Sequence, residues 1–105
     1  MNKIFIFLIL FFSLITNIKA DTKRIISGND SAKITIIAYE SLTCSHCASF
    51  HKEIYPLLKK EFIDTGLVRI EFRHFPLDIA AFNASKIAQC KKDQGLEILE
   101  SLYSN

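Results

Sequence analysis

The sequence predicts an α/β fold in which two strands and the helix between them form a βαβ unit, followed by further helices. Residues 34–39 are mostly β-branched or aromatic, in a run short enough for a buried strand. Apolar residues then recur at spacings of three and four, which predicts a helix with an inward face formed by Cys47, Phe50, Ile54, Leu57, Leu58 and Phe62. Residues 67–75 alternate between apolar and charged side chains, as a second strand does. A crossover of this kind is right-handed and joins parallel strands.

Smaller elements are predicted around this unit. Residues 24–26 favour a short edge strand that precedes a turn. Pro56 lies inside the helical pattern, where it is expected to kink the helix or divide it in two. Gly66 is placed to end this helix as a left-handed C-cap. Two more helices are predicted, one from about residue 78 to residue 91 and one over residues 96–103.

The chemistry of the chain centres on Cys44-Ser45-His46-Cys47, at the start of the predicted crossover helix. Backbone N–H groups and the helix dipole stabilise an anion there, so the Cys44 thiol should lose its proton more readily than a free cysteine. Cys47 lies one helical turn further on, close enough to form a disulfide with Cys44. His46 can add positive charge beside the thiolate at mildly acid pH. A purely stabilising bridge is the alternative, but a loop of four residues gains little from loop entropy. The pattern therefore favours a redox dithiol.

The first twenty residues read as a secretory signal peptide, cleaved after Ala20. Lys3 supplies a short positive region, and residues 4–15 are apolar except for Ser13. An uncleaved membrane anchor is the alternative, but the apolar run is shorter than the ~20 residues that a spanning helix needs. Export would place the protein in the periplasm, an oxidising compartment where disulfides form.

The remaining residues, 21–105, are enough for one small domain and carry a balanced charge. Lys3 and Lys19 are two of the thirteen basic residues, so eleven basic residues face eleven acidic ones in this domain. Its lysine pairs, at residues 59–60 and 91–92, are isolated on predicted helices and indicate solvated surface. Nothing in the charge pattern predicts binding of nucleic acid.

Several stretches carry a resemblance to a known family: Gly28 to Ile36, Ser41 to Cys47, Phe72 to Asp78, Ala88 to Cys90, and Gln94-Gly95. Together they cover most of the chain after residue 25. With a C-x-x-C motif between a strand and a helix, and a Phe-Pro-Leu segment downstream, the chain resembles the DsbA-like branch of the thioredoxin superfamily. The resemblance implies a thioredoxin-like fold and a protein-disulfide oxidoreductase.

The resemblance also implies roles for the motif. Cys44 would be the exposed nucleophile that forms mixed disulfides with client proteins carrying free thiols or disulfides, and Cys47 would resolve them. A histidine often occupies the place of His46 in this family, where it favours the thiolate and makes the disulfide a strong oxidant. Ser45 replaces the proline that is usual there. Relatives are reoxidised by a quinone-linked membrane partner, and no cofactor or metal is implied.

Two departures from the family pattern stand out. An acidic residue commonly lies six positions before the first cysteine, where it can exchange protons with the buried sulfur, but this chain has Ala38 there. Glu40 would point to the same side if the strand extended that far. The family also adds two final strands and a cis-proline loop, whereas this chain ends at Asn105 and its two prolines, Pro56 and Pro76, lie elsewhere.

The domain is therefore expected to be partial, truncated before those final strands. We expect the apolar side chains of Phe62, Phe72, Phe75 and Phe82 to be only partly covered. A complementing chain, a homodimer or a gene that has lost its second half would each account for this.

The remaining candidate residues have more ordinary expectations. Cys90 is expected to be a buried structural thiol, with a regulatory or intermolecular disulfide as the alternative. His51 and His74 are expected at the surface or at a strand end.

Two other functions compete with the oxidoreductase. A metal-binding or metallochaperone module would use Cys44, Cys47 and a histidine to hold copper or zinc. A non-catalytic remnant would keep the motif without the activity. Attachment of haem is disfavoured, because Ala48 follows Cys47 where that chemistry needs a histidine.

Overall fold

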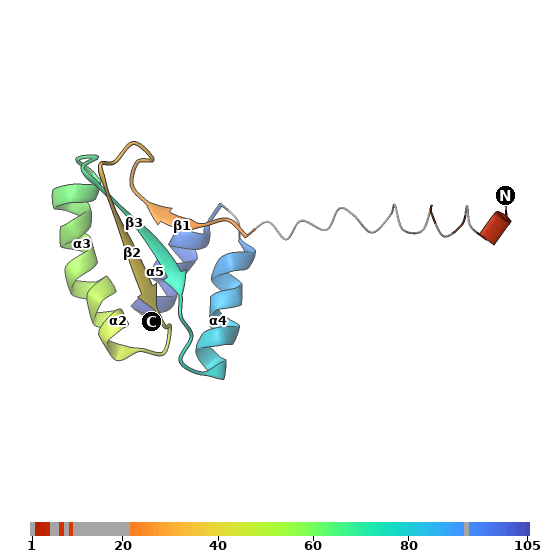
Figure 1. Cartoon of the computed structure of the whole chain (residues 1–105). Coiled ribbons are helices and arrows are strands. Elements are labelled where there is room, and N and C mark those ends of the chain that lie inside the picture. Colours follow the sequence, from red (N-terminus) through yellow and green to blue (C-terminus); the bar gives the residue numbers. More distant parts are fainter. Residues whose placement is uncertain (1, 5–6, 8, 10–21, 92) are drawn as a thin grey trace.

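A computed structural model shows a three-stranded mixed sheet (Figure 1). It describes residues 2–4, 7, 9, 22–91 and 93–105. Strand β3 (Val68–His74) lies in the middle, parallel to β2 (Ile34–Glu40) and antiparallel to the short strand β1 (Ile25–Ser27). The predicted βαβ unit and the predicted edge strand are both confirmed.

A continuous run of helical segments connects β2 to β3. It consists of α2 (Ser45–Ser49), the π-helical turn η1 (Phe50–Ile54), α3 (Tyr55–Leu58) and a second π-helical turn, η2 (Lys59–Ile63). We call this run the crossover helix. Pro56 lies in the first turn of α3, where its missing N–H is tolerated. The interruption predicted at this proline is therefore a π-helical turn and not a break in the helix.

The inward face predicted for the crossover helix is correct in part, since Cys47, Phe50 and Leu58 pack against the core. Ile54 and Leu57 are 52% and 61% exposed, whereas His51, Tyr55 and Ile63 are buried. The prediction followed aliphatic spacing and passed over Tyr55, whose hydroxyl donates to Ser27 Oγ at 2.8 Å and is thereby satisfied inside. The two π-helical turns also shift the angular position of every residue that follows them.

The second half of the chain contains two further helices, α4 (Ile79–Cys90) and α5 (Gly95–Ser104), as predicted. Asp78 caps α4, accepting a hydrogen bond from the Ala81 N–H at 2.7 Å. Before β3, Gly66 has a φ of +80°, so the predicted left-handed residue at the end of the crossover helix is confirmed.

The core lies between the sheet, the crossover helix and α5. Val68, Ile70 and Phe72 of β3 are buried on the inner face, and Leu99 of α5 is fully buried with them. The predicted alternation along β3 is therefore correct. The expectation that Phe72 is only partly covered is wrong, because the rings of Tyr55 and His51 pack against it at 5.4 and 5.1 Å between ring centroids.

Strand β2 forms one edge of the sheet, which corrects the expectation of a buried strand. It pairs with β3 on one side, and within the described residues no strand pairs with its other side. Ile37 and Tyr39 are 45% and 63% exposed in consequence. Phe62, Phe75 and Phe82 are also exposed, as expected for incompletely covered apolar faces.

Most of the predicted signal peptide, residues 1–20, lies outside the described residues, and its cleavage stays a prediction. In the described part of the chain, no helix combines the length and apolar character that crossing a membrane requires.

Candidate active site

The two cysteines of the motif lie where the end of β2 turns into the crossover helix. Cys44 is the N-cap of α2, with an extended backbone (φ −86°, ψ 117°). Its N–H donates to the Ser41 carbonyl at 3.1 Å, and its own carbonyl accepts from the Ala48 N–H at 3.1 Å. The chain therefore places the first thiol beside the free N–H groups of the first helical turn, as the sequence predicts.

This position gives the two thiols different acidities. The Cys47 N–H is the largest of the influences that lower the pKa of Cys44, followed by the Cys47 thiol and then the His46 N–H. Burial is the main influence that raises the pKa of Cys47, and the charges of Cys44 and Glu40 add to it. The pKa of the first thiol is therefore lowered and that of the second is raised, a difference that suits stepwise disulfide exchange.

His46 presents its side chain to solvent from α2. Its main-chain N–H is among the groups that stabilise the Cys44 thiolate. The electrostatic contribution of its imidazole stays a prediction.

A polar clamp fixes the loop before Cys44 to the segment before α4. Thr43 Oγ1 donates to Asp78 Oδ2 at 2.7 Å, and the Leu77 N–H donates to Ser41 Oγ at 3.3 Å. The Ala81 N–H and then the Thr43 hydroxyl lower the pKa of Asp78. Two stretches that the sequence separates by more than thirty residues thus meet beside the dithiol.

Glu40 and His51 form a buried pair on the inner side of the dithiol. His51 Nε2 lies 3.0 Å from Glu40 Oε1 and 2.9 Å from Oε2, so its N–H donates to both oxygens. The side chains are only 3% exposed for His51 and 5% for Glu40. The expectation that His51 lies at the surface or at a strand end is wrong. Glu40 is reached because β2 extends to it and places it on the same face as Ala38.

Sequence reasoning missed this pair, although two signals for it exist. Cys47, His51 and Tyr55 follow one another at intervals of four, which places them on one face of a helix. Glu40 is an acidic residue at the end of an otherwise apolar strand. Neither signal specifies burial, because the burial of His51 depends on α5, whose Tyr103 ring stacks on the imidazole.

Aromatic rings enclose the His51 imidazole. The Tyr103 ring of α5 stacks on it at 4.1 Å with an interplanar angle of 16°, and the rings of Phe72, Tyr55 and Phe50 lie within 6 Å. Burial raises the pKa of Tyr103, as do the charges of Glu40 and both motif cysteines. Tyr103 is therefore within electrostatic reach of the dithiol.

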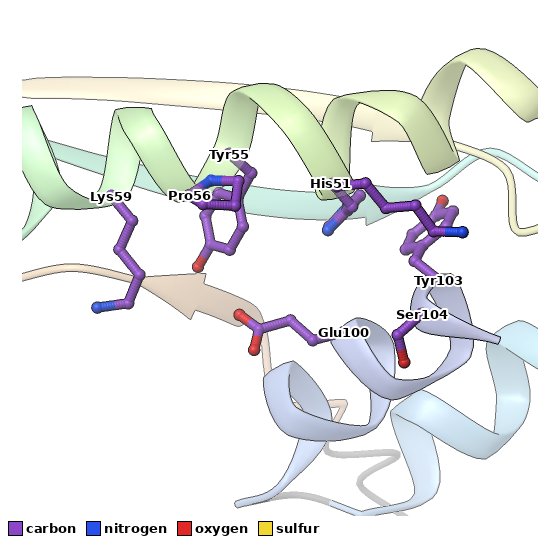
Figure 2. Close-up of a pocket in the computed structure, with 8 residues that line it drawn as sticks. His51, Tyr55, Pro56, Lys59, Glu100, Tyr103 and Ser104 are labelled. Carbon is purple, nitrogen blue, oxygen red and sulfur yellow. The ribbon is translucent and has the colours of Figure 1, made fainter.

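A cavity of about 360 Å³ opens between the crossover helix and α5, next to this stack. Figure 2 shows side chains from the two helices facing each other across it. It is lined by His51, Lys52, Tyr55, Pro56, Lys59, Glu100, Tyr103 and Ser104.

His74 and Cys90 lie at the ends of β3 and α4. His74 ends β3, as expected, opposite Glu40 in the register, and burial lowers its pKa. Cys90 is exposed at the end of α4, so the expectation of a buried thiol is wrong. The buried face of α4 consists of Ala81, Ser85 and Ala88, and a residue two positions beyond Ala88 points away from it.

The residues described do not gather the donors that a metal site needs. Among them, no group of three or more His, Cys, Asp or Glu side chains is placed to hold a metal ion. The set that the alternative function requires, two cysteines and a histidine, is therefore not brought together in this part of the chain.

A strand that leads into a helix with Cys44 at its N-cap position, beside a mixed sheet, is typical of a thioredoxin-type fold, and comparison with known proteins agrees. The thioredoxin family model matches residues 20–105, so the chain belongs to that family. Within it, the chain falls in the DsbA-like branch. The crystal structure of alpha-DsbA1 from Wolbachia pipientis superposes with a TM-score of 0.72 and 32% identity, covering 89% of this chain and 46% of that one.

Sequence relatives point the same way. A Rickettsia bellii protein, provisionally named a protein-disulfide oxidoreductase, is 39% identical over 75 residues, which are 71% of this chain and 29% of the relative. Disulfide bond formation protein D of Bacillus subtilis is 36% identical over 45 residues, which are 43% of this chain and 20% of that protein. The chain thus spans less than a third of the length of these relatives.

Proposed function

We propose that the protein is an exported thiol–disulfide oxidoreductase that forms or exchanges disulfides in secreted proteins through Cys44 and Cys47. One observation carries the proposal most directly. The fold lowers the pKa of the first thiol and raises that of the second, within a family whose relatives are named for disulfide chemistry.

The proposed reaction proceeds in two exchanges. A client thiolate attacks Cys44 Sγ of the Cys44–Cys47 disulfide, forming a client–Cys44 disulfide and releasing Cys47 as a thiolate, which takes up a proton. A second client thiolate then attacks the client sulfur of that mixed disulfide, and Cys44 leaves as a thiolate. The client loses two electrons and the dithiol gains them.

The main-chain N–H groups at the helix start favour this direction, because they stabilise the Cys44 thiolate that leaves in the second exchange. We assign the His46 imidazole a supporting role through its positive charge at mildly acid pH. Ser45 occupies the place where a proline is usual in the family.

Location and partners follow from the same proposal. Residues 1–20 would direct export to the periplasm and leave residues 21–105 as the partial DsbA-like domain. The partners would be client proteins with free thiols or disulfides, and a quinone-linked membrane protein would reoxidise the dithiol. A strand from a second copy or from a complementing chain would pair with the side of β2 that has no strand partner among the described residues.

Trapping tests this proposal. Cys47→Ala should accumulate a mixed disulfide with a peptide that carries a disulfide, because the Cys44 thiolate attacks that disulfide, one peptide sulfur leaves as a thiolate, and no Cys47 thiol remains to release the other. Cys44→Ala should trap none, and Cys90→Ser, which changes an exposed thiol far along α4, should behave like the unchanged protein. The measurement is mass spectrometry of the adducts after acid quenching.

Two results would contradict the proposal. Equal trapping by both motif variants would mean that Cys44 has no special role. No exchange by the unchanged protein would favour a non-catalytic remnant, and stoichiometric copper or zinc bound to the reduced protein would favour the metal-binding alternative.

A further inference from the structure

The polar clamp beside the dithiol contains a chain of side-chain hydrogen bonds that passes through the residue before Cys44. Ser41 Oγ lies 3.2 Å from Thr43 Oγ1, and Thr43 Oγ1 donates to Asp78 Oδ2 at 2.7 Å. Ser41 is 3% exposed, while Thr43 and Asp78 lie at the surface. The proposed exchange reaction gives these side chains no role.

The Asp78 carboxylate fixes the direction of this chain. A charged carboxylate accepts hydrogen bonds and donates none, so the single hydroxyl proton of Thr43 is directed to Asp78. The Ser41 hydroxyl must then donate to Thr43 Oγ1, while its oxygen accepts from the Leu77 N–H at 3.3 Å. Both hydroxyls therefore point along the chain toward Asp78. A hydrogen bond from a hydroxyl to a carboxylate is also stronger than one between neutral groups.

Asp78 is itself held by the start of α4. Its other oxygen, Oδ1, accepts from the Ala81 N–H at 2.7 Å, so one carboxylate joins the helix cap to the loop before the dithiol. The Ala81 N–H and then the Thr43 hydroxyl lower the pKa of Asp78, so both contacts favour its charged form. Helix α4 thus gives this loop a fixed point of attachment.

The same loop sets the position of Cys44. The Ser41 carbonyl accepts from the Cys44 N–H at 3.1 Å, which closes a turn over residues 41–44. Thr43 is the residue of this turn that precedes the N-cap of α2. The N–H groups of a helix start act over a short distance, and hydrogen bonds weaken steeply when they are misaligned. A small movement of the turn would therefore weaken the stabilisation of the Cys44 thiolate.

We propose that Asp78 is a positioning residue for the dithiol: through Thr43 it fixes the turn of residues 41–44 and holds the Cys44 sulfur at the helix start. This inference rests on the proposed function, in which clients attack Cys44 and Cys44 leaves as a thiolate in the second exchange. Holding the sulfur where its thiolate is stabilised favours release of the oxidised client.

Two possible effects of Asp78 on Cys44 have opposite signs, so they can be separated. As a nearby negative charge, the carboxylate disfavours a thiolate, and removing it should lower the pKa of Cys44. As a positioning residue it favours the thiolate, and removing it should raise that pKa. The other ionisable groups around the motif are Glu40 of β2, His46 of α2 and Tyr103 of α5, and the variants below leave them unchanged.

The first test titrates Cys44 in a background of Cys47→Ser and Cys90→Ser, where it is the one remaining cysteine. The ultraviolet absorbance of the thiolate is read against pH. Thr43→Val removes the hydroxyl without changing any charge, so it should raise the pKa of Cys44. The fraction of thiolate at a pH below the midpoint should fall about threefold.

Asp78→Ser keeps a residue that caps helices but has a side chain too short to reach Thr43. It should raise the pKa of Cys44 by less than Thr43→Val does, because the lost negative charge acts in the opposite direction. The two changes combined should titrate like Asp78→Ser alone, since the link is already broken.

Two controls accompany these variants. Thr43→Ser keeps the hydroxyl and should restore the titration of the unchanged turn. Thr65→Val is the matched control, because it removes an exposed hydroxyl that donates to the Phe62 carbonyl at 2.9 Å, at the opposite end of the crossover helix. It should leave the titration of Cys44 in place.

The second test measures the redox equilibrium with both motif cysteines present. The oxidised protein is equilibrated with glutathione, quenched with acid and analysed by mass spectrometry. A less stabilised thiolate favours the disulfide, so Thr43→Val should lower the equilibrium constant for reduction about threefold. Thr43→Ser and Thr65→Val should leave it unchanged.

The outcomes separate this inference from the proposed function. If Thr43→Val does not move the titration of Cys44, the clamp serves stability alone and the inference fails. It also fails if Asp78→Ser lowers the pKa of Cys44 while Thr43→Val leaves it in place, because the carboxylate then acts only through its charge. Circular dichroism during urea unfolding shows which variants fold, and Thr43→Val, at an exposed position, decides if Asp78→Ser does not. Failure of the unchanged protein to exchange disulfides would remove the proposed function but not the titration result.

Discussion

The two ends of strand β2 have opposite environments. At its carboxyl end the charged residue Glu40 is buried and bound by His51, while along the rest of the strand the apolar residues Ile34, Ile37 and Tyr39 face solvent. A soluble domain normally shows the reverse arrangement. The difference indicates that the end of β2 next to the dithiol is packed into the inner face, while the rest of the strand lies at an edge with no further strand partner among the described residues.

Packing around the inner face gives the largest expected effect on stability. Leu99 of α5 is fully buried against the sheet and lies one helical turn before Tyr103. Leu99→Ala should lower the free energy of unfolding by about 2–5 kcal/mol, the cost of lost burial plus a cavity. Urea unfolding followed by circular dichroism measures it.

A small change in the free energy of unfolding for Leu99→Ala would contradict the contrast between the packed inner face and the exposed edge, because it would mean that α5 does not cover the inner face in solution. Leu99→Met is the matched control, since it keeps most of the volume and should cost clearly less. Leu99→Met should also leave the alkylation rate of Cys44 unchanged, because it does not alter the start of the crossover helix.

Features of the fold and of the site are predictable from the sequence where they depend on residues close together in the chain. Strand β3 and helices α4 and α5 follow from periodicity, and the acidity of Cys44 follows from its position at a helix start. Each of these depends on residues within one or two turns of one another.

Features that depend on distant partners were not predictable in the same way. The burial of His51 requires Glu40 on one side and Tyr103 on the other, from segments far apart in the sequence. The exposure of Cys90 depends on which three residues of α4 meet the core. The position of β2 at an edge depends on the strand order, which an apolar run does not reveal.

The clamp at the dithiol end gives a smaller effect with a defined pH dependence. Asp78 has a lowered pKa, so its contribution to stability is present above the ordinary pKa of an aspartate and is lost as the pH falls through the lowered value. Asp78→Asn should therefore lower the midpoint of urea unfolding at neutral pH. The difference from the unchanged protein should shrink as the pH falls below the ordinary pKa of an aspartate.

Thr43→Val separates the two contacts of this carboxylate. It removes the hydroxyl that donates to Asp78 and leaves the helix cap from Ala81 in place. The variant should therefore show a weaker version of the same pH dependence. A constant difference across the whole pH range would show that the charge of Asp78 is not what stabilises the clamp.

The free edge of the sheet gives the smallest expected effect. Ile37 is half-exposed on the outer face of β2, so Ile37→Thr keeps the β-branched shape and removes little buried surface. We expect a change in the free energy of unfolding within about 0.5 kcal/mol. Ile70→Thr, its buried counterpart on β3, should cost several times more because it places a hydroxyl in the core.

Comparable losses of stability from the two variants would overturn the contrast within β2, because they would mean that its outer face is covered in solution. Repeating the measurement over a range of protein concentrations would then test whether a second copy covers it.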